Sequence, residues 1–204
     1  MTDASARTTP EPGAPVRTRP LYEDALVLLG SWEPPDPGQE RARSRYVAHL
    51  EDHRDGLRRS CFPEHVTASA LILSTDGEQV LLTLHAKANA WFQMGGHCED
   101  ADTTLAGAAL REAVEESGVE RLTLDADPVQ LHAHAVPFCN PRGTVTHLDV
   151  RFLAVAPPDA VHAVSDESLD VRWFPWDGLP TDDPDMHELV ALARARLHSR
   201  PASP

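Results

Sequence analysis

The sequence is poor in cysteine and lacks long apolar runs. Its 204 residues include three cysteines, Cys61, Cys98 and Cys139, an odd number without a C-x-x-C spacing. We therefore expect free thiols in a reducing compartment. No stretch approaches the roughly 18 consecutive apolar residues of a membrane-spanning helix, and the N-terminus lacks the apolar core of a signal peptide. The sequence therefore predicts a soluble, cytoplasmic protein without a membrane partner.

Positive charge is also scarce. Lys87 is the only lysine, and 18 Lys and Arg residues stand against 32 Asp and Glu residues, for a formal net charge of -14. Because no basic run is present, we do not expect a nucleic-acid polymer as partner. A phosphorylated small-molecule substrate would need a metal ion or a local basic patch to offset this negative field. The composition leaves a homodimer open.

The chain divides into three predicted parts. Residues 1–20 are rich in proline, threonine and alanine, so we expect a disordered tail. Residues 21–62 are predicted to form a helical extension of two helices, 21–32 and 38–57, separated by a proline-rich breaker. Residues 63–200 are predicted to form the main domain. A hydrophobic content of 41% is enough for its packed core.

The main domain mixes strands with two helices. Apolar, β-prone runs at 66–74 and 79–85 flank a turn and predict a hairpin. Further strands are predicted at 91–94, 122–124, 129–136, 147–156 and 171–174, with residues 137–144 as the loop of a second hairpin. Helices are predicted within 102–118 and over 183–197. This order predicts an α/β or α+β fold with a mixed central sheet between helices.

Carboxylates gather in one stretch, residues 95–119. The pair Gly95 and Gly96 leads into an acidic loop, and an alanine-rich helix then ends in Arg-Glu-x-x-Glu-Glu-x-Gly. At about 100° per residue, Glu112, Glu115 and Glu116 share roughly one 100° arc of that helix. Three carboxylates this close repel one another unless a cation lies between them, and Mg²⁺ or Mn²⁺ prefers such oxygen ligands. A solvated acidic helix end is the alternative.

The same stretch resembles the Nudix box, Gly-x5-Glu-x7-Arg-Glu-U-x-Glu-Glu-x-Gly-U, where U is a bulky aliphatic residue. From Gly96 the chain reads Gly-x5-Asp-x8-Arg-Glu-Ala-Val-Glu-Glu-Ser-Gly-Val. The half from Arg111 through the helix C-cap Gly118 matches at every charged and glycine position. Asp102 replaces the first Glu and lies one residue further from the arginine. The resemblance covers about residues 66–178 and implies a Nudix-like α/β/α sandwich with a mixed central β-sheet.

The resemblance also implies hydrolysis of a nucleoside diphosphate linked to another moiety, with Mg²⁺ or Mn²⁺ as cofactor. It assigns Glu112 and Glu116 as the principal metal ligands and Glu115 as a ligand or bridge. The carbonyl of Gly96 is a further implied ligand. Arg111 is expected to orient the glutamates through a salt bridge, with a simple helix-surface ion pair as the alternative. Metals in such a site neutralise charge on phosphate oxygens and lower the pKa of a bound water.

A later acidic loop supplies another candidate. Many relatives draw a further acid from a loop well after the box, as metal ligand or general base. Glu167 lies about six residues before a tryptophan, where a relative's acid often falls, and we predict this catalytic role for it. An ordinary acidic turn is the alternative, and Asp166 and Asp170 are alternatives within the same loop.

Three residues near the glycine pair are predicted to bind substrate. Lys87 and Trp91 lie before the pair, where a cation suits a phosphate and an aromatic ring suits a base. His97 follows the pair and is the third candidate. A solvated lysine beside core aromatics is the alternative interpretation for the first two.

The histidines and cysteines suggest two other chemistries. His132, His134 and His147 could face one another across strands, but no cysteine or carboxylate completes a recognisable zinc spacing. His97 and Cys98 invite comparison with isopentenyl diphosphate isomerase, which has a similar fold. That family places its cysteine before the Gly-His pair and usually lacks the full Arg-Glu-x-x-Glu-Glu, so the order here argues against it.

The sequence therefore predicts a metal-dependent Nudix pyrophosphohydrolase. A catalytically silent, nucleotide-binding Nudix module with a regulatory role is the second hypothesis, because the first half of the box is altered. The intact Arg-Glu-x-x-Glu-Glu favours the hydrolase. No tyrosine follows Tyr46, which argues against a diadenosine polyphosphate substrate. The substrate is otherwise undetermined.

Overall fold

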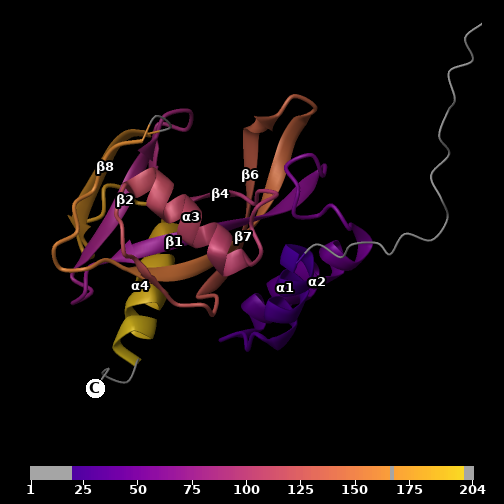
Figure 1. Ribbon diagram of the computed structural model, residues 1–204, viewed down its shortest axis with the longest axis horizontal. Helices are drawn as coiled ribbons and strands as arrows, with labels where there is room; N and C mark the ends of the chain where they lie inside the picture. The colour runs from indigo at the N-terminus through magenta and orange to yellow at the C-terminus, as the bar shows by residue number, and fades with distance from the viewer. Residues whose placement is uncertain (1–19, 166–167, 200–204) are drawn as a thin grey trace, which may run out of the picture.

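The computed structural model describes residues 20–165 and 168–199, and Figure 1 shows how they are arranged. The helices are α1 (Pro20–Ser31), α2 (Pro37–Asp52), α3 (Leu105–Ser117) and α4 (Pro184–Ser199). The strands are β1 (Glu64–Leu73), β2 (Gln79–His85), β3 (Ala90–Phe92), β4 (Met94–His97), β5 (Thr123–Leu124), β6 (Gln130–Asn140), β7 (Gly143–Val155) and β8 (Ser168–Pro175). None of these helices is long and apolar enough to cross a membrane.

The strands form one mixed sheet in which β1 is central. The path runs β3-β2-β1-β7-β5, while β4 pairs with β1, β6 with β7 and β8 with β2. The pair β1 and β7 is parallel and the other pairs are antiparallel. Strand β1 changes its antiparallel partner along its length: Ile72 and Leu73 pair with β2, whereas Thr67 to Ala70 pair with β4. This change lays the glycine pair of β4 along the first half of β1.

Alternation along the buried strands builds two cores, one on each face of the sheet. Ala70 and Ile72 of β1 join the larger cluster, which also contains the apolar faces of α1, α2 and α3. Leu71 and Leu73 point the other way, into a cluster completed by Leu189 and its neighbours on α4. Side chains two residues apart share a face of a strand, so one apolar run supplies both cores. The predicted α/β/α sandwich with a mixed sheet is confirmed.

The N-terminal helices share the main core. Leu29 of α1 and Tyr46 of α2 are fully buried in the same cluster as α3, and Figure 1 shows both helices at the end of the sheet away from β8. The Trp32 indole N–H donates to the carbonyl of Pro128, 2.9 Å away. The predicted tail falls outside the described residues except for Pro20, which begins α1. The division into tail, extension and main domain stays a prediction.

Two local expectations were wrong. Residues 137–144 are mostly strand, because β6 continues to Asn140 and β7 starts at Gly143. A register shift between Val136 and Asn140 provides the irregularity that a proline inside a strand requires. Helix α2 ends at Asp52 rather than near residue 57, because His53 takes an extended backbone (φ -129, ψ 99) at the C-cap.

Candidate active site

Helix α3 carries the three glutamates to the glycine pair. The helix begins at Leu105 because the Thr104 side chain caps it, accepting the N–H of Gly107 at 2.9 Å. It ends where Gly118 turns left-handed (φ 66), a conformation that glycine adopts without strain. Since α3 packs on β1 and β4, its carboxylate face lies against β4.

Arg111 holds the carboxylates in place. Its Nε and Nη2 donate to the two oxygens of Asp102 at 3.1 and 2.9 Å. Its Nη1 donates to Glu112 and Glu115, both at 3.0 Å, and Nη2 also donates to the carbonyl of His97 at 3.0 Å. Burial alone would raise the pKa of Asp102, but the hydrogen bonds from Arg111 and a backbone N–H hold it below its usual value. Asp102 therefore orients the guanidinium of Arg111, which in turn contacts the glutamates.

The glycine pair lets the glutamates lie against the backbone. The N–H of Gly95 donates to Glu116 at 2.9 Å, and the Glu116 side chain is buried. A Cβ at position 96 would lie 2.8 Å from the carboxylate of Glu112, so any larger residue there would displace that carboxylate. Several carboxylates crowded around one guanidinium form a negative, oxygen-rich site, which is the donor set that Mg²⁺ and Mn²⁺ prefer. The residues present fit such a cation.

These residues line a cavity of about 670 Å³. Its wall includes the three glutamates, both glycines, His97 and the exposed Lys87, so the structure brings these predicted site residues together. Trp91 lies elsewhere: its ring packs edge-on against Phe174, with centroids 4.8 Å apart, on the α4 side. Phe92 lines the cavity instead, because successive residues of β3 point to opposite faces.

The other candidates lie away from the cavity lining or outside the described residues. Cys98 and Asp102 line a separate, smaller cavity, and burial raises the pKa of the Cys98 thiol to about 12. Cys98 is not among the residues that line the glutamate cavity, which gives the isomerase hypothesis no support. Glu167 and its alternative Asp166 lie outside the described residues. The carboxylate of Asp170 accepts from Arg172 at 2.6 Å.

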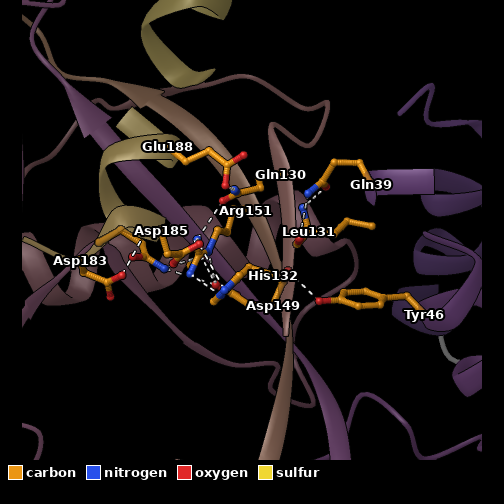
Figure 2. A network of polar contacts seen from close by, with 12 residues as sticks. Gln39, Tyr46, Gln130, Leu131, His132, Asp149, Arg151, Asp183, Asp185 and Glu188 are labelled. Atoms are coloured by element: carbon orange, nitrogen blue, oxygen red, sulfur yellow. Dashed lines mark hydrogen bonds and ion pairs between the residues drawn. The ribbon is translucent and has the colours of Figure 1, made fainter. Parts of the chain in front are cut away.

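A buried polar network on the cavity wall was missed in the sequence. Figure 2 shows Arg151 at its centre, donating to Asp149 at 3.2 Å, to Gln130 at 2.8 Å and to Asp185 at 2.9 Å. Burial would raise the pKa of Asp149, but Arg151 and His134 hold that pKa below its usual value. The sequence pattern that could have revealed this network is the pair of charged residues Asp149-x-Arg151 in an otherwise apolar strand.

The histidines considered for zinc face one another as expected: the ring centroid of His134 lies 5.6 Å from that of His132 and 5.5 Å from that of His147, its register partner across β6 and β7. His132 contacts Arg151, with 3.0 Å between Nδ1 and Nη2, and therefore belongs to the network of Figure 2. His147 instead lies with His65, His97 and Cys139. Burial, helped by the neighbouring rings, lowers the pKa of His97 to about 4 and that of His147 to about 3. Both imidazoles are therefore neutral near pH 7.

The fold and the glutamate site define an α/β/α sandwich whose helix α3 presents clustered carboxylates to a cavity. The family model described as NUDIX domain matches residues 63–193, and the chain belongs to that family. The resemblance predicted from the box is thereby confirmed.

Solved structures agree on the fold. An Ap4A hydrolase from C. elegans, in a binary complex, is 21% identical with a TM-score of 0.51, covering 66% of this chain and 98% of that one. The dihydroneopterin triphosphate pyrophosphohydrolase of E. coli is 18% identical with a TM-score of 0.50, covering 64% and 95%. A search of curated proteins found no match. At these identities the similarity concerns the fold alone.

Proposed function

We propose that the chain is a divalent-cation-dependent hydrolase that cleaves a diphosphate bond in a nucleoside diphosphate derivative. The observation that carries this proposal is the carboxylate face of α3, which lines a cavity large enough for a nucleotide. Glu112 and Glu116 would hold Mg²⁺ or Mn²⁺, with Glu115 and the Gly96 carbonyl as further ligands. The cation would neutralise charge on the phosphate oxygens and lower the pKa of a bound water.

The chain's own groups position that chemistry. Arg111 fixes the rotamers of Glu112 and Glu115, and the Gly95 N–H fixes Glu116. Each carboxylate therefore keeps its place before substrate arrives, which lowers the cost of ordering the site. Glu167 remains our proposal for the additional acid.

Substrate contacts follow from the remaining lining residues. Phe92 and Phe138 are 36% and 44% exposed and both line the cavity, so either ring can stack on a base. Lys87 lies on the same wall and suits a phosphate. We therefore propose that Phe92, rather than Trp91, is the aromatic contact of this loop.

The test is turnover of a substrate panel with and without Mg²⁺ or Mn²⁺. The panel contains nucleoside triphosphates, nucleoside diphosphate sugars, Ap4A and dihydroneopterin triphosphate. The last two are included because the C. elegans and E. coli hydrolases of similar fold are named for them. We expect phosphate products only with added cation, and a fall in kcat of at least about 100-fold in Glu116→Gln, the loss typical of a charge-stabilising group. Glu120→Gln, on the exposed residue just beyond α3, is the matched control.

The opposite outcome would support the silent module. In that case no compound is turned over with either cation, while a nucleotide binds equally well to the wild type and to Glu116→Gln. The bidentate contact of Asp102 with Arg111 argues against this outcome, because the altered half of the box still secures the arginine.

A further inference from the structure

Four strands bring three histidines and a cysteine together beside the cavity. His65 lies on β1, His97 on β4, Cys139 on β6 and His147 on β7. Each offers one ligand atom, and these atoms all lie within 4.8 Å of one another. His65 is fully buried and Cys139 is 8% exposed. The group is separate from the glutamates of α3, which offer only oxygen.

The sulfur-to-nitrogen distances are close to the corresponding edges of a metal-centred tetrahedron. The Cys139 sulfur lies 3.3 Å from Nε2 of both His97 and His147, and 3.9 Å from Nε2 of His65. Bonds of about 2.3 Å to sulfur and about 2.0 Å to nitrogen at a tetrahedral angle place N and S about 3.5 Å apart. The three rings are also evenly spaced, with centroids 5.1, 4.9 and 5.0 Å apart.

The backbone explains this convergence. The parallel register sets His65 opposite His147, and β4 pairs His97 with Thr67 on the other side of β1. The register shift that follows Val136 in β6 re-aims Cys139, as bulges do for residues at functional positions.

The hydrogen-bond inventory favours a bound cation. His65 Nδ1 lies 3.0 Å from the carbonyl of Cys61, so Nδ1 carries the proton and Nε2 presents a lone pair to the cluster. A thiol is a weak donor with one proton and a weak acceptor, so the three Nε2 atoms that meet at Cys139 find only weak hydrogen bonds there, whichever tautomers His97 and His147 adopt. A cation at the centre would satisfy all four ligand atoms together. The contact from His65 to a backbone carbonyl is also the outer-shell support that metal-bound histidines usually have.

We propose that His65, His97, Cys139 and His147 bind one zinc ion in tetrahedral geometry. Three imidazoles and a thiolate suit zinc rather than Mg²⁺, and binding releases the thiol proton of Cys139. Four protein ligands close the coordination shell, so the ion has a structural role. The ion links the β6–β7 hairpin to β1 and β4. It also fixes the position of His97, whose backbone carbonyl accepts a hydrogen bond from Arg111. His97 then serves the site through this ion rather than by touching substrate.

The first test is metal content. Untagged protein is dialysed against a chelator, reloaded with zinc or cobalt, and analysed by mass spectrometry for metals and by absorption. We expect about one zinc per chain, and tetrahedral Co²⁺ bands together with a thiolate charge-transfer band. Cys139→Ser and His147→Gln should each weaken zinc binding by more than about 100-fold, because even outer-shell changes cost 10- to 100-fold. Cys61→Ser, which changes a buried thiol outside the cluster, is the matched control.

The proposal is overturned if folded, reloaded wild type holds neither metal, or if Cys139→Ser and His147→Gln bind zinc like the wild type. Should the variants not fold, alkylation of the wild type decides instead. Zinc must slow modification of Cys139 more than that of Cys61, and equal rates contradict the site. The inference does not depend on the hydrolase proposal, because Glu116→Gln should lose turnover while its zinc content stays unchanged.

Discussion

Arg111 sets the geometry of the glutamates through a fork that only a guanidinium provides. It reaches both oxygens of Asp102 and one oxygen each of Glu112 and Glu115. A lysine keeps the charge but offers a single point contact. We therefore expect Arg111→Lys to lower kcat/KM by about 10- to 100-fold, the cost of misplacing catalytic groups by a fraction of an ångström to an ångström.

Steady-state kinetics with the best substrate of the panel measures this loss. Arg121→Lys is the control, because both partners of its ion pair with Asp159 are exposed and neither lines the cavity. Wild-type rates in Arg111→Lys would show that the fork is dispensable.

Asp102 contacts Arg111 although it departs from the motif in both residue type and spacing. Aspartate is one methylene shorter than the glutamate of the box, and one extra residue separates it from Arg111. The structure nevertheless gives it a bidentate contact with that arginine and a further bond from the N–H of Glu99. We interpret the longer loop as supplying the reach that the shorter side chain lacks.

At the scale of elements, the end of α3 depends on one glycine. Gly118 has φ 66, and a Cβ there would lie 2.8 Å from the Cβ of Ala163. Gly118→Ala should destabilise the protein by more than about 1 kcal/mol, because it combines left-handed strain with a clash. Gly30→Ala in α1 is the matched control: nothing lies within 4 Å of its Cβ, and it should be neutral or stabilising by up to about 1 kcal/mol.

Urea unfolding of the two variants beside the wild type gives both values. Equal stability of Gly118→Ala and the wild type would mean that the backbone after α3 can adopt another conformation without loss of unfolding free energy.

Local patterns explain which elements could be predicted from sequence. The helical period and charges of residues 105–117 lie within one segment, so the amino-acid sequence alone predicts α3 and its glutamates. The cluster of His65 and Cys139 could not be predicted in this way, because it depends on the register of β1 with β7 and on the irregularity in β6. The position of Trp91 outside the cavity lining could not be predicted for a similar reason, since the face of a three-residue strand is set by its neighbours.

At the scale of the whole molecule, the N-terminal helices belong to the main core. Leu29 is fully buried beside α3 and the sheet, whereas Val27 on the same helix is 70% exposed. Leu29→Ala should cost about 2–5 kcal/mol, the usual cost of a cavity in a core, and Val27→Ala should stay within about 0.5 kcal/mol.

Calorimetry can check this prediction and the cooperativity behind it. If α1 and the sheet share one core, Leu29→Ala lowers the midpoint of a single transition. Two transitions, with only the first one shifted, would show that α1 and α2 unfold by themselves.

The docking contacts of these helices also bear on synthesis. Gln39 bonds to Leu131 and Tyr46 to Asp149, across 92 and 103 positions of sequence. The ribosome makes the chain from its N-terminus, so α1 and α2 emerge long before the strands that cover them. The apolar faces of α1 and α2 therefore stay exposed to solvent until β7 has left the ribosomal exit tunnel. The nascent chain is therefore most exposed to aggregation, and most in need of a chaperone, while this middle part of the protein is being translated.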